Sequence, residues 1–173
     1  YDFMINLAHF KGHAMGGFGG VLKNQSIGIA SANGKAYIHT AGKTADKNLI
    51  WKENRDVPQD HFIEAMAASA QSVHDYFDGK ILYINVMNNL SVDCDCDNHP
   101  ADPEMNDIGI LASIDPVALD QACVDLVFNY PSQDGDDAKA LIERINSRHG
   151  VHIIEHAAAI GLGSREYELV KID

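Results

Sequence analysis

The alternation of hydrophobic and polar positions along the chain predicts a layered α/β fold. Near-continuous apolar runs at residues 1–10 and 81–87 are typical of strands buried on both faces, as in a parallel sheet. Residues 107–113 predict a third buried strand, and a short strand is expected at residues 35–40. Residues 166–172 alternate with a period of two and predict a final strand.

Helical periodicity predicts four helices. Residues 115–130 predict a helix capped by Asp115, whose side chain precedes a proline in the first turn. Residues 136–150 and 151–163 predict two more helices, each ending at a glycine. The helix expected to begin near Pro58 has one apolar stripe, formed by Phe62, Met66, Ala70, Val73 and Phe77.

Strands that alternate with helices indicate an α/β fold with a mostly parallel sheet and helices on both faces. We expect one domain over residues 1–173, which is long enough to bury a substantial core. Two segments are expected to be loops: polar residues 40–56, anchored by Trp51, and residues 88–107. A long loop without periodicity is commonly functional or disordered, so the second segment is the first place to look for a site.

Composition narrows the classes of partner. The formal net charge is −12, which makes nucleic acid and anionic membrane poor partners for the surface as a whole. No apolar run approaches the roughly 20 residues of a membrane span. With three cysteines, a disulfide framework is not expected. We therefore expect a cytoplasmic protein with no nucleic-acid or membrane partner.

The sequence "LSVDCDCDNHP" at residues 90–100 carries the first candidate site. In an extended segment Cys94 and Cys96 point to one side and the alternating aspartates to the other. A disulfide between them would close a strained small ring. Two neighbouring thiols suit a soft metal, zinc or iron, which would offset the surrounding acids. His99 is close in sequence, although its direction cannot be predicted.

Two histidines at the end of the first strand are the expected partners of these thiols. "HFKGH" places His9 and His13 four residues apart, across a glycine that permits a tight turn. Ligands gather at the carboxyl ends of strands in open α/β sheets. If the first strand neighbours the strand that ends near Met87, these histidines and the two thiols form a Cys2His2 set. The alternative is that the thiols are reduced loop residues and the histidines are scattered polar groups.

The glycine-rich "GGFGGVLKN" at residues 16–24 is the second candidate site. Glycines before a helix can expose backbone N–H groups to a phosphate or carboxylate, and a nearby lysine adds charge. Tight packing of the helix on the sheet explains the glycines equally well. The residues of this anion-binding alternative are Gly17, Gly19, Gly20 and Lys23.

The remaining cysteine and several histidines carry no predicted chemistry. Cys123 lies on the apolar side of its expected helix and is interpreted as a core residue. Five histidines fall within helical patterns and are assigned no role: His61, His74, His149, His152 and His156.

Four blocks of the chain resemble the domain-of-unknown-function 362 family, whose members are described as uncharacterised iron–sulfur centre proteins. The blocks are, in order, "AHFKGHAMGGFGGVLKN", "DGKILYINVMNNLSVDCDC", "DIGILASIDPVALDQACVDLV" and "GLGSREYELVKI". The resemblance implies a shared pattern of metal-ligating residues: His9, His13, a histidine near His39, Cys94 and Cys96.

The resemblance also limits the cofactor. Many members carry a ferredoxin-like insert before the helix that begins near Pro58, where this chain has a short loop without cysteine. A ferredoxin-type four-cysteine cluster is therefore not expected. Because members usually have a further α/β segment before the first strand, we expect a missing N-terminal segment or a ferredoxin-like partner.

Two hypotheses on function follow from these observations. The first hypothesis is a metal-binding domain with zinc or iron in a redox or Lewis-acid role on an unknown small molecule. The second is a non-catalytic module for a small anion or nucleotide.

Overall fold

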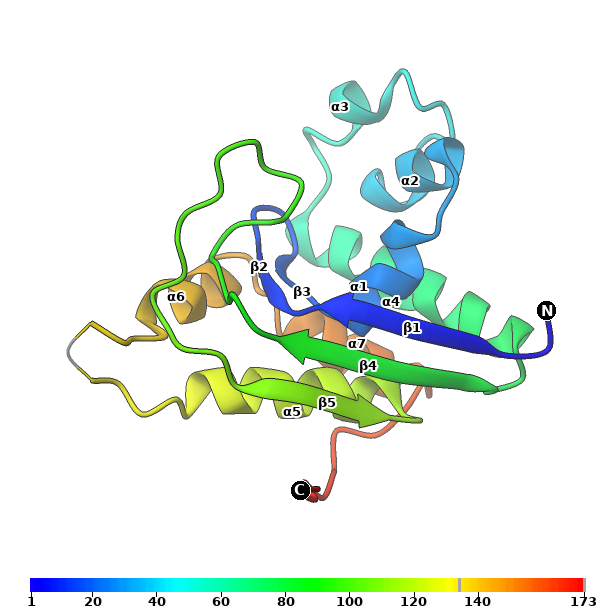
Figure 1. Ribbon diagram of the computed structural model, residues 1–173. Helices are drawn as coiled ribbons and strands as arrows, with labels where there is room; N and C mark the ends of the chain where they lie inside the picture. Colours follow the sequence, from blue (N-terminus) through cyan, green and yellow to red (C-terminus); the bar gives the residue numbers. More distant parts are fainter. Residues whose placement is uncertain (134, 173) are drawn as a thin grey trace.

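Three strands form the central sheet in the computed structural model, which describes residues 1–133 and 135–172 (Figure 1). The strands lie in the order β1 (Met4–His9), β4 (Ile81–Met87) and β5 (Gly109–Ser113). β1 and β4 are parallel, whereas β4 and β5 are antiparallel. The three strands lie where the apolar runs predict them. The expected burial is wrong, because β5 has no buried residue and Ile5 and Leu7 of β1 are exposed.

The expectation of a mostly parallel sheet is wrong, because one of the two strand pairings is antiparallel. The reason lies in the connections. The chain between β1 and β4 contains helices that carry it back to the starting edge of the sheet, as a parallel crossover requires. Residues 88–108 between β4 and β5 contain no helix or strand. The chain therefore enters β5 at the end where it left β4 and runs back antiparallel.

Seven α-helices and one π-helical segment occur in residues 1–133 and 135–172. Four of the helices, α4 to α7, confirm the four helices predicted from periodicity. Asp115 caps α5 as predicted, because its Oδ1 accepts hydrogen bonds from the N–H groups of Val117 and Ala118. The bounds are α1 Val21–Lys23, the π-helix η1 Asn24–Gly28, α2 Ala32–His39, α3 Ile50–Glu53, α4 Gln59–Tyr76, α5 Pro116–Phe128, α6 Lys139–Ser147 and α7 His152–Ala159.

Two expected strands are absent from the described structure. Residues 35–39 belong to α2 and Thr40 caps its end. The helix begins at Ala32, after Ser31, whose side chain accepts a hydrogen bond from the Gly34 N–H. This cap outweighs the short apolar run that favoured a strand. Residues 166–172 run beside β5 and α5 without regular structure, despite their alternating pattern. Residues 40–56 are mostly loop, as predicted, but include α3.

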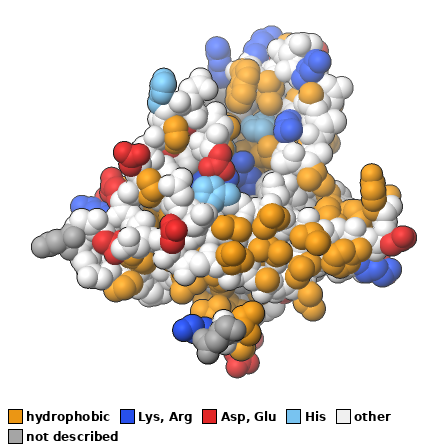
Figure 2. Space-filling model, in the orientation of Figure 1, with side chains coloured by type: hydrophobic (Ala, Val, Ile, Leu, Met, Phe, Trp, Pro, Cys, Tyr) orange, Lys and Arg blue, Asp and Glu red, His pale blue; other side chains and the backbone are white. Residues whose placement is uncertain are grey.

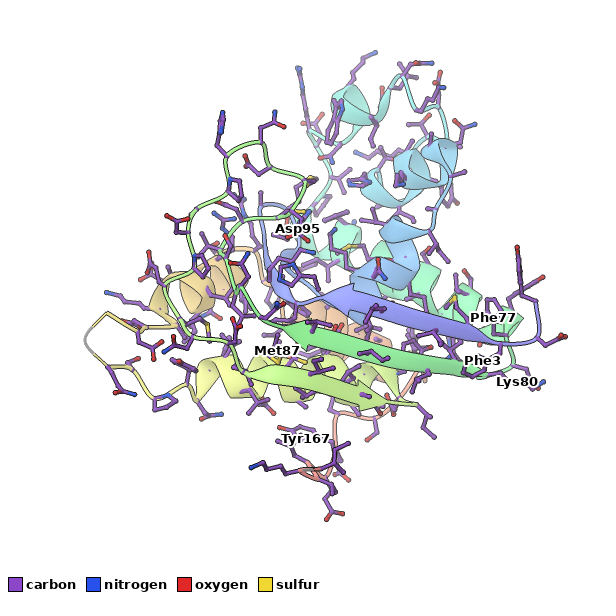
Figure 3. The ribbon with its side chains drawn as sticks, viewed as in Figure 1. Phe3, Phe77, Lys80, Met87, Asp95 and Tyr167 are labelled. Atoms are coloured by element: carbon purple, nitrogen blue, oxygen red, sulfur yellow. The ribbon has the colours of Figure 1, made fainter. Side chains whose placement is uncertain are left out.

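The helices lie on one face of the sheet, so the expectation of helices on both faces is wrong (Figures 1 and 3). Alternate side chains of β4, including Tyr83 and Met87, are buried beneath the helices. The opposite face exposes large apolar side chains, among them Ile5, Leu7 and Ile110 (Figure 2). A near-continuous apolar run shows that both faces of a strand carry apolar side chains. It cannot show whether helices cover both of those faces.

Candidate metal centre

Two segments that follow neighbouring strands lie side by side at one end of the sheet. β1 ends at His9 and β4 ends at Met87, and their parallel pairing brings these two ends together. After β1 the chain forms a hairpin, in which β2 (Lys11–His13) pairs with β3 (Gly17–Gly19). After β4 it forms the cysteine-containing loop, residues 88–108. The predicted adjacency of the first strand and the strand before the cysteines is therefore confirmed.

The hairpin and the cysteine loop touch at Gly12. The Gly12 N–H donates to the Ser91 carbonyl at 2.8 Å. A Cβ atom at residue 12 would overlap with the backbone carbonyl of Val92. The glycine of "HFKGH" therefore allows two backbones to approach closely. It does not form the tight turn that the sequence suggested, because the turn of the hairpin lies between β2 and β3.

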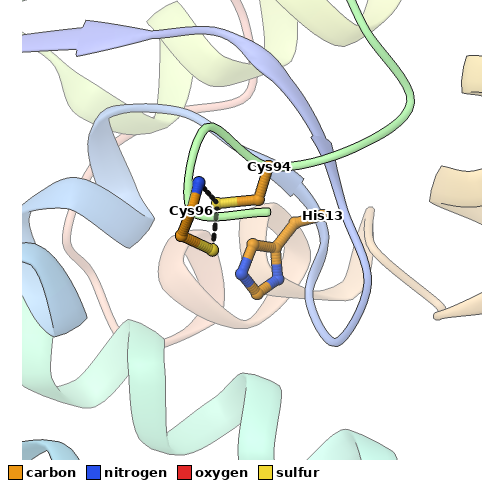
Figure 4. A group of neighbouring side chains, drawn as sticks. All are labelled: His13, Cys94 and Cys96. Carbon is orange, nitrogen blue, oxygen red and sulfur yellow. Dashed lines mark hydrogen bonds between the residues drawn. The ribbon is translucent and has the colours of Figure 1, made fainter. Parts of the chain in front are cut away.

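His13, Cys94 and Cys96 form one group at this contact (Figure 4). One ligand atom from each residue lies within 4.8 Å of the ligand atoms of the other two. The two sulfur atoms are 2.8 Å apart, and both cysteines are free thiols. Of the predicted Cys2His2 set, the structure thus brings together three members, two thiols and one imidazole.

The His13 imidazole is neutral at physiological pH, as a metal ligand must be. Burial lowers the pKa of His13 to about 3, with smaller contributions from Lys23, Lys11, His39 and Arg144. Its Nδ1 accepts hydrogen bonds from the N–H groups of Met15 and Gly16, at 3.2 and 3.0 Å. The neutral ring therefore carries its proton on Nε2. Ligation through Nε2 requires that proton to move to Nδ1, which breaks both bonds to the hairpin.

Two of the three aspartates of "DCDCD" have cations of their own. Asp93 pairs with Arg144 at 3.1 Å, and Asp95 pairs with Lys11 at 2.9 Å. Burial raises the pKa of Asp95, but hydrogen bonds from Lys11 and His9 outweigh it and hold the pKa below the usual range. These carboxylates are neutralised locally, so their charge opposes thiolate formation less than the sequence suggests.

The pKa of the Cys96 thiol is raised overall, against smaller opposing influences. The contact with Cys94 and burial raise the pKa of Cys96, whereas the nearby Lys23 ammonium lowers it. A coordinated metal ion would remove this thiol proton outright, because a bound thiol is deprotonated. The sulfurs therefore suit a cation that supplies its own charge.

His9 stands apart from the three-residue group. Its Nδ1 lies 2.9 Å from an oxygen of Asp95, and its Nε2 lies 2.7 Å from the carbonyl oxygen of Asn88. Both nitrogens face acceptor oxygens of the cysteine loop, and His9 is not a member of the group whose ligand atoms lie within 4.8 Å of one another. His9 holds the cysteine loop against the end of β1 (Figure 3 marks Asp95).

His39 and His99 differ in how well they suit the site. His39 is buried, stacks on Phe62 at 5.3 Å between ring centres, and lies near enough to influence His13. Its Nδ1 donates to the Lys35 carbonyl at 2.7 Å, which leaves an Nε2 lone pair. His99 is exposed at the far part of the loop. Neither belongs to the group of described residues whose ligand atoms all lie within 4.8 Å.

A polar cavity of about 200 Å³ lies beside the cysteine loop, where His9 and Asp95 line it. Gly19, Gly20 and Lys23, three of the four residues proposed for anion binding, line it together with Lys11. The fourth, Gly17, packs against Gly150 and does not line this cavity.

A buried carboxylate that the sequence did not reveal occupies the start of α1. Asp120 accepts hydrogen bonds from the N–H groups of Val21 and Leu22, both at 3.0 Å, and from the Asn85 side chain at 2.7 Å. A Cβ atom at Gly20 would overlap with this carboxylate. The N–H groups that the glycine pattern suggested for an external anion therefore bind an internal one. Only the tertiary contact reveals this carboxylate, because Asp120 and Val21 are 99 positions apart in the chain.

The family model described as domain of unknown function (DUF362) matches residues 1–125. The chain belongs to this family. The DUF362 match contains the hairpin, the cysteine loop and Asp120, whereas α6 and α7 lie beyond it. No curated protein and no solved structure matches the chain. Among the described residues, no helix has the length and apolar character needed to cross a membrane.

Proposed function

We propose that this DUF362 chain binds a soft transition metal ion, zinc or iron, through Cys94, Cys96 and His13. The observation that carries the proposal is the convergence of two thiols and a neutral imidazole within 4.8 Å. Thiolate and imidazole are the ligands preferred by zinc and iron, whereas magnesium and calcium prefer oxygen. With three cysteines in the chain, one of them buried in α5, a four-cysteine cluster cannot form from this chain alone.

His39 is the preferred fourth ligand. Its tautomer leaves Nε2 free, and the Lys35 carbonyl orients the ring as outer hydrogen bonds commonly do for metal-binding histidines. Without His39 in place, the ion would keep an open position. That position would allow Lewis-acid or redox chemistry on a small molecule in the adjoining cavity. A ferredoxin-like partner would supply electrons in the redox case.

Elemental analysis of purified protein tests the proposal. The comparison is between wild type and the C94S/C96S variant, with C123S as the matched control for loss of a thiol. We expect near-stoichiometric metal in wild type and C123S, and a loss of about one equivalent in C94S/C96S. A wild-type protein purified without chelators under reducing conditions that contains no metal and takes up none would overturn the proposal.

A second candidate function rests on Lys23. Its ammonium lies in the cavity lined by Lys11, Gly19 and Gly20, and it has no hydrogen bond or ion pair within the described part of the chain. Burial lowers the pKa of Lys23, while the neighbouring Cys94 raises it. Lys11 and Lys23 converge over Gly19, but Lys11 is paired with Asp95, which also lines the cavity. The charge that favours a small anion is therefore that of Lys23. The cavity volume suits phosphate or a short carboxylate, since drug-sized ligands occupy about 300–1,000 Å³.

A further inference from the structure

Three histidines and three acidic residues gather where α4 packs against α7, on residues to which the sequence patterns assigned no role. His152 and His156 lie one turn apart on α7, so both side chains project from the same face of the helix. Glu64 on α4 faces them. One ligand atom from each of these three residues lies within 4.8 Å of the others.

The distances match the ligand shell of a divalent ion. His152 Nε2 lies 3.1 Å from Glu64 Oε1, and His156 Nδ1 lies 3.9 Å from the same oxygen. Two ligands of a tetrahedral zinc ion, each about 2.0–2.1 Å from the metal, lie about 3.3 Å apart. Small side-chain rotations would therefore admit an ion among these three atoms.

A fourth residue, Glu155, lies against the other nitrogen of the His152 imidazole. Glu155 Oε2 lies 3.5 Å from His152 Nδ1, on the side of the ring opposite Glu64. A carboxylate that accepts from one ring nitrogen fixes the tautomer whose other nitrogen can bind a metal. Arg165 also contacts Glu155 at 3.5 Å and anchors it.

The spacing of the histidines in this segment matches a pattern found in zinc enzymes. Residues 152–156 read "HIIEH", and the pattern H-x-x-E-H places two histidines on one helical face in a class of zinc enzymes. Here Glu155 contacts His152 and Arg165, so its role is to position an imidazole. The side chains of His152 and His156 are 20% and 27% exposed, which leaves them accessible to an ion and to a water ligand.

The surrounding charge favours a cation. Asp60 lies 2.7 Å from His149 Nδ1, and the His149 ring stacks on His152 at 4.9 Å between ring centres. Glu64, Glu155 and Asp60 thus surround the imidazoles with carboxylates. Arg165 opposes this negative charge through its ion pair with Glu155.

We propose that Glu64, His152 and His156 form a second metal site, specific for a divalent ion that accepts imidazole and carboxylate ligands, with zinc as the reference ion. Two nitrogens and one oxygen from the protein leave a fourth position for water. The site is independent of the thiol site, because it uses no cysteine and lies beyond the residues matched by the DUF362 model, apart from Glu64.

Titration of the metal-free C94S/C96S protein with zinc chloride tests the second site by itself. We expect one equivalent of zinc bound by calorimetry, and none after the further change H152Q/H156Q. The matched control is H61Q, which changes an exposed histidine of α4 outside the three-residue group and should leave zinc binding unchanged. If H152Q/H156Q binds zinc as tightly as its C94S/C96S parent, the proposal is overturned.

Two further measurements test the second site even if the H152Q/H156Q variant folds poorly. E155Q retains both imidazoles, and we expect it to weaken zinc binding by about 10–100-fold, as loss of an outer carboxylate does. Cobalt(II) in the C94S/C96S protein should give visible absorption without a thiolate charge-transfer band, and E155Q should shift it. An E155Q protein with unchanged affinity and an unchanged cobalt spectrum would contradict the arrangement of ligands.

Discussion

Gly12 and Val92 are in direct backbone contact, with no room for a side chain at residue 12. This contact sets the distance between the hairpin that carries His13 and the loop that carries the two cysteines. The spacing of the candidate metal centre therefore depends on the absence of a Cβ atom at residue 12.

We expect Gly12→Ala to displace the cysteine loop and to lower metal content. Forcing an atom into a closely packed contact costs about 1–3 kcal/mol in the free energy of unfolding. The measurements are urea unfolding and metal content. Gly16→Ala is the matched control on the same hairpin, because its new Cβ would meet no atom closer than 3.4 Å. Equal metal content in the two variants would contradict this role for Gly12.

His13 and His9 differ in their predicted effect on metal binding. His13→Gln should lose most of the bound metal, whereas His9→Gln should retain it, because both His9 nitrogens already face Asp95 and the Asn88 carbonyl. Metal content of the two purified variants provides the measurement. The opposite result, with loss in His9→Gln alone, would favour the ligand pair that the sequence first suggested.

Zinc binding by His13 has a second consequence in the hairpin. Movement of the ring proton to Nδ1 removes the acceptor of the Met15 and Gly16 N–H groups. We expect the amide resonances of these two residues to shift on zinc addition, and the His13 nitrogens to report a change of tautomer. Unchanged Met15 and Gly16 resonances in zinc-loaded protein would show that His13 is not the ligand and would point to His39.

The central parts of the fold could be predicted from the sequence, whereas the arrangement of the sheet could not. Buried strands and capped helices leave local signals, such as the apolar run of β4 and the Asp115 cap. Strand direction depends on what lies between strands, and the loop between β4 and β5 gives no local signal of a reversal. The expected strand at residues 166–172 has the right alternation but is not paired as a strand in the described structure.

The thiols of the candidate site could be predicted from the sequence, whereas the histidine beside them could not. The alternation in "DCDCD" indicated that the thiols share a side, and the strand ends indicated where their partner lies. Which histidine meets them depends on hydrogen bonds to distant residues, because Asp95 engages His9 and leaves His13 beside the sulfurs. The α4–α7 group was missed because Glu64 and His152 are 88 positions apart in the chain.

Lys23 should control the affinity of the cavity for inorganic phosphate. Lys23→Gln removes the ammonium that has no partner in the described structure, and we expect phosphate binding to weaken about tenfold or more, as loss of a charge-assisted hydrogen bond does. Lys80→Gln is the control, because Lys80 is exposed and pairs with Asp78 away from the cavity. Calorimetric titration that gives equal affinities for both variants would contradict the anion site.

Asp120 should make stability depend on pH in the opposite sense to the surface carboxylates. Burial raises its pKa to about 6, against hydrogen bonds from Asn85, Leu22 and Val21. The folded state therefore holds this proton more tightly than the unfolded state, where an aspartate has a pKa of about 3.9. Its contribution to stability is present below about pH 4 and is lost as the pH rises through about 6.

The Asp120→Asn variant isolates that contribution. Between pH 4 and 7, the stability of wild type relative to Asp120→Asn should fall by about 2 kcal/mol, most of what a pKa difference of about two units supplies. Urea unfolding of both proteins across this range provides the measurement, and the difference between them removes the contribution of other groups. A constant difference would show that Asp120 does not titrate in this range.

X-ray absorption at the metal edge of the purified protein tests the thiol centre most directly. We predict a coordination shell with two sulfur atoms at about 2.3 Å together with nitrogen, and loss of the sulfur shell in C94S/C96S. A metal shell of nitrogen and oxygen alone in the wild-type protein would contradict ligation by Cys94 and Cys96.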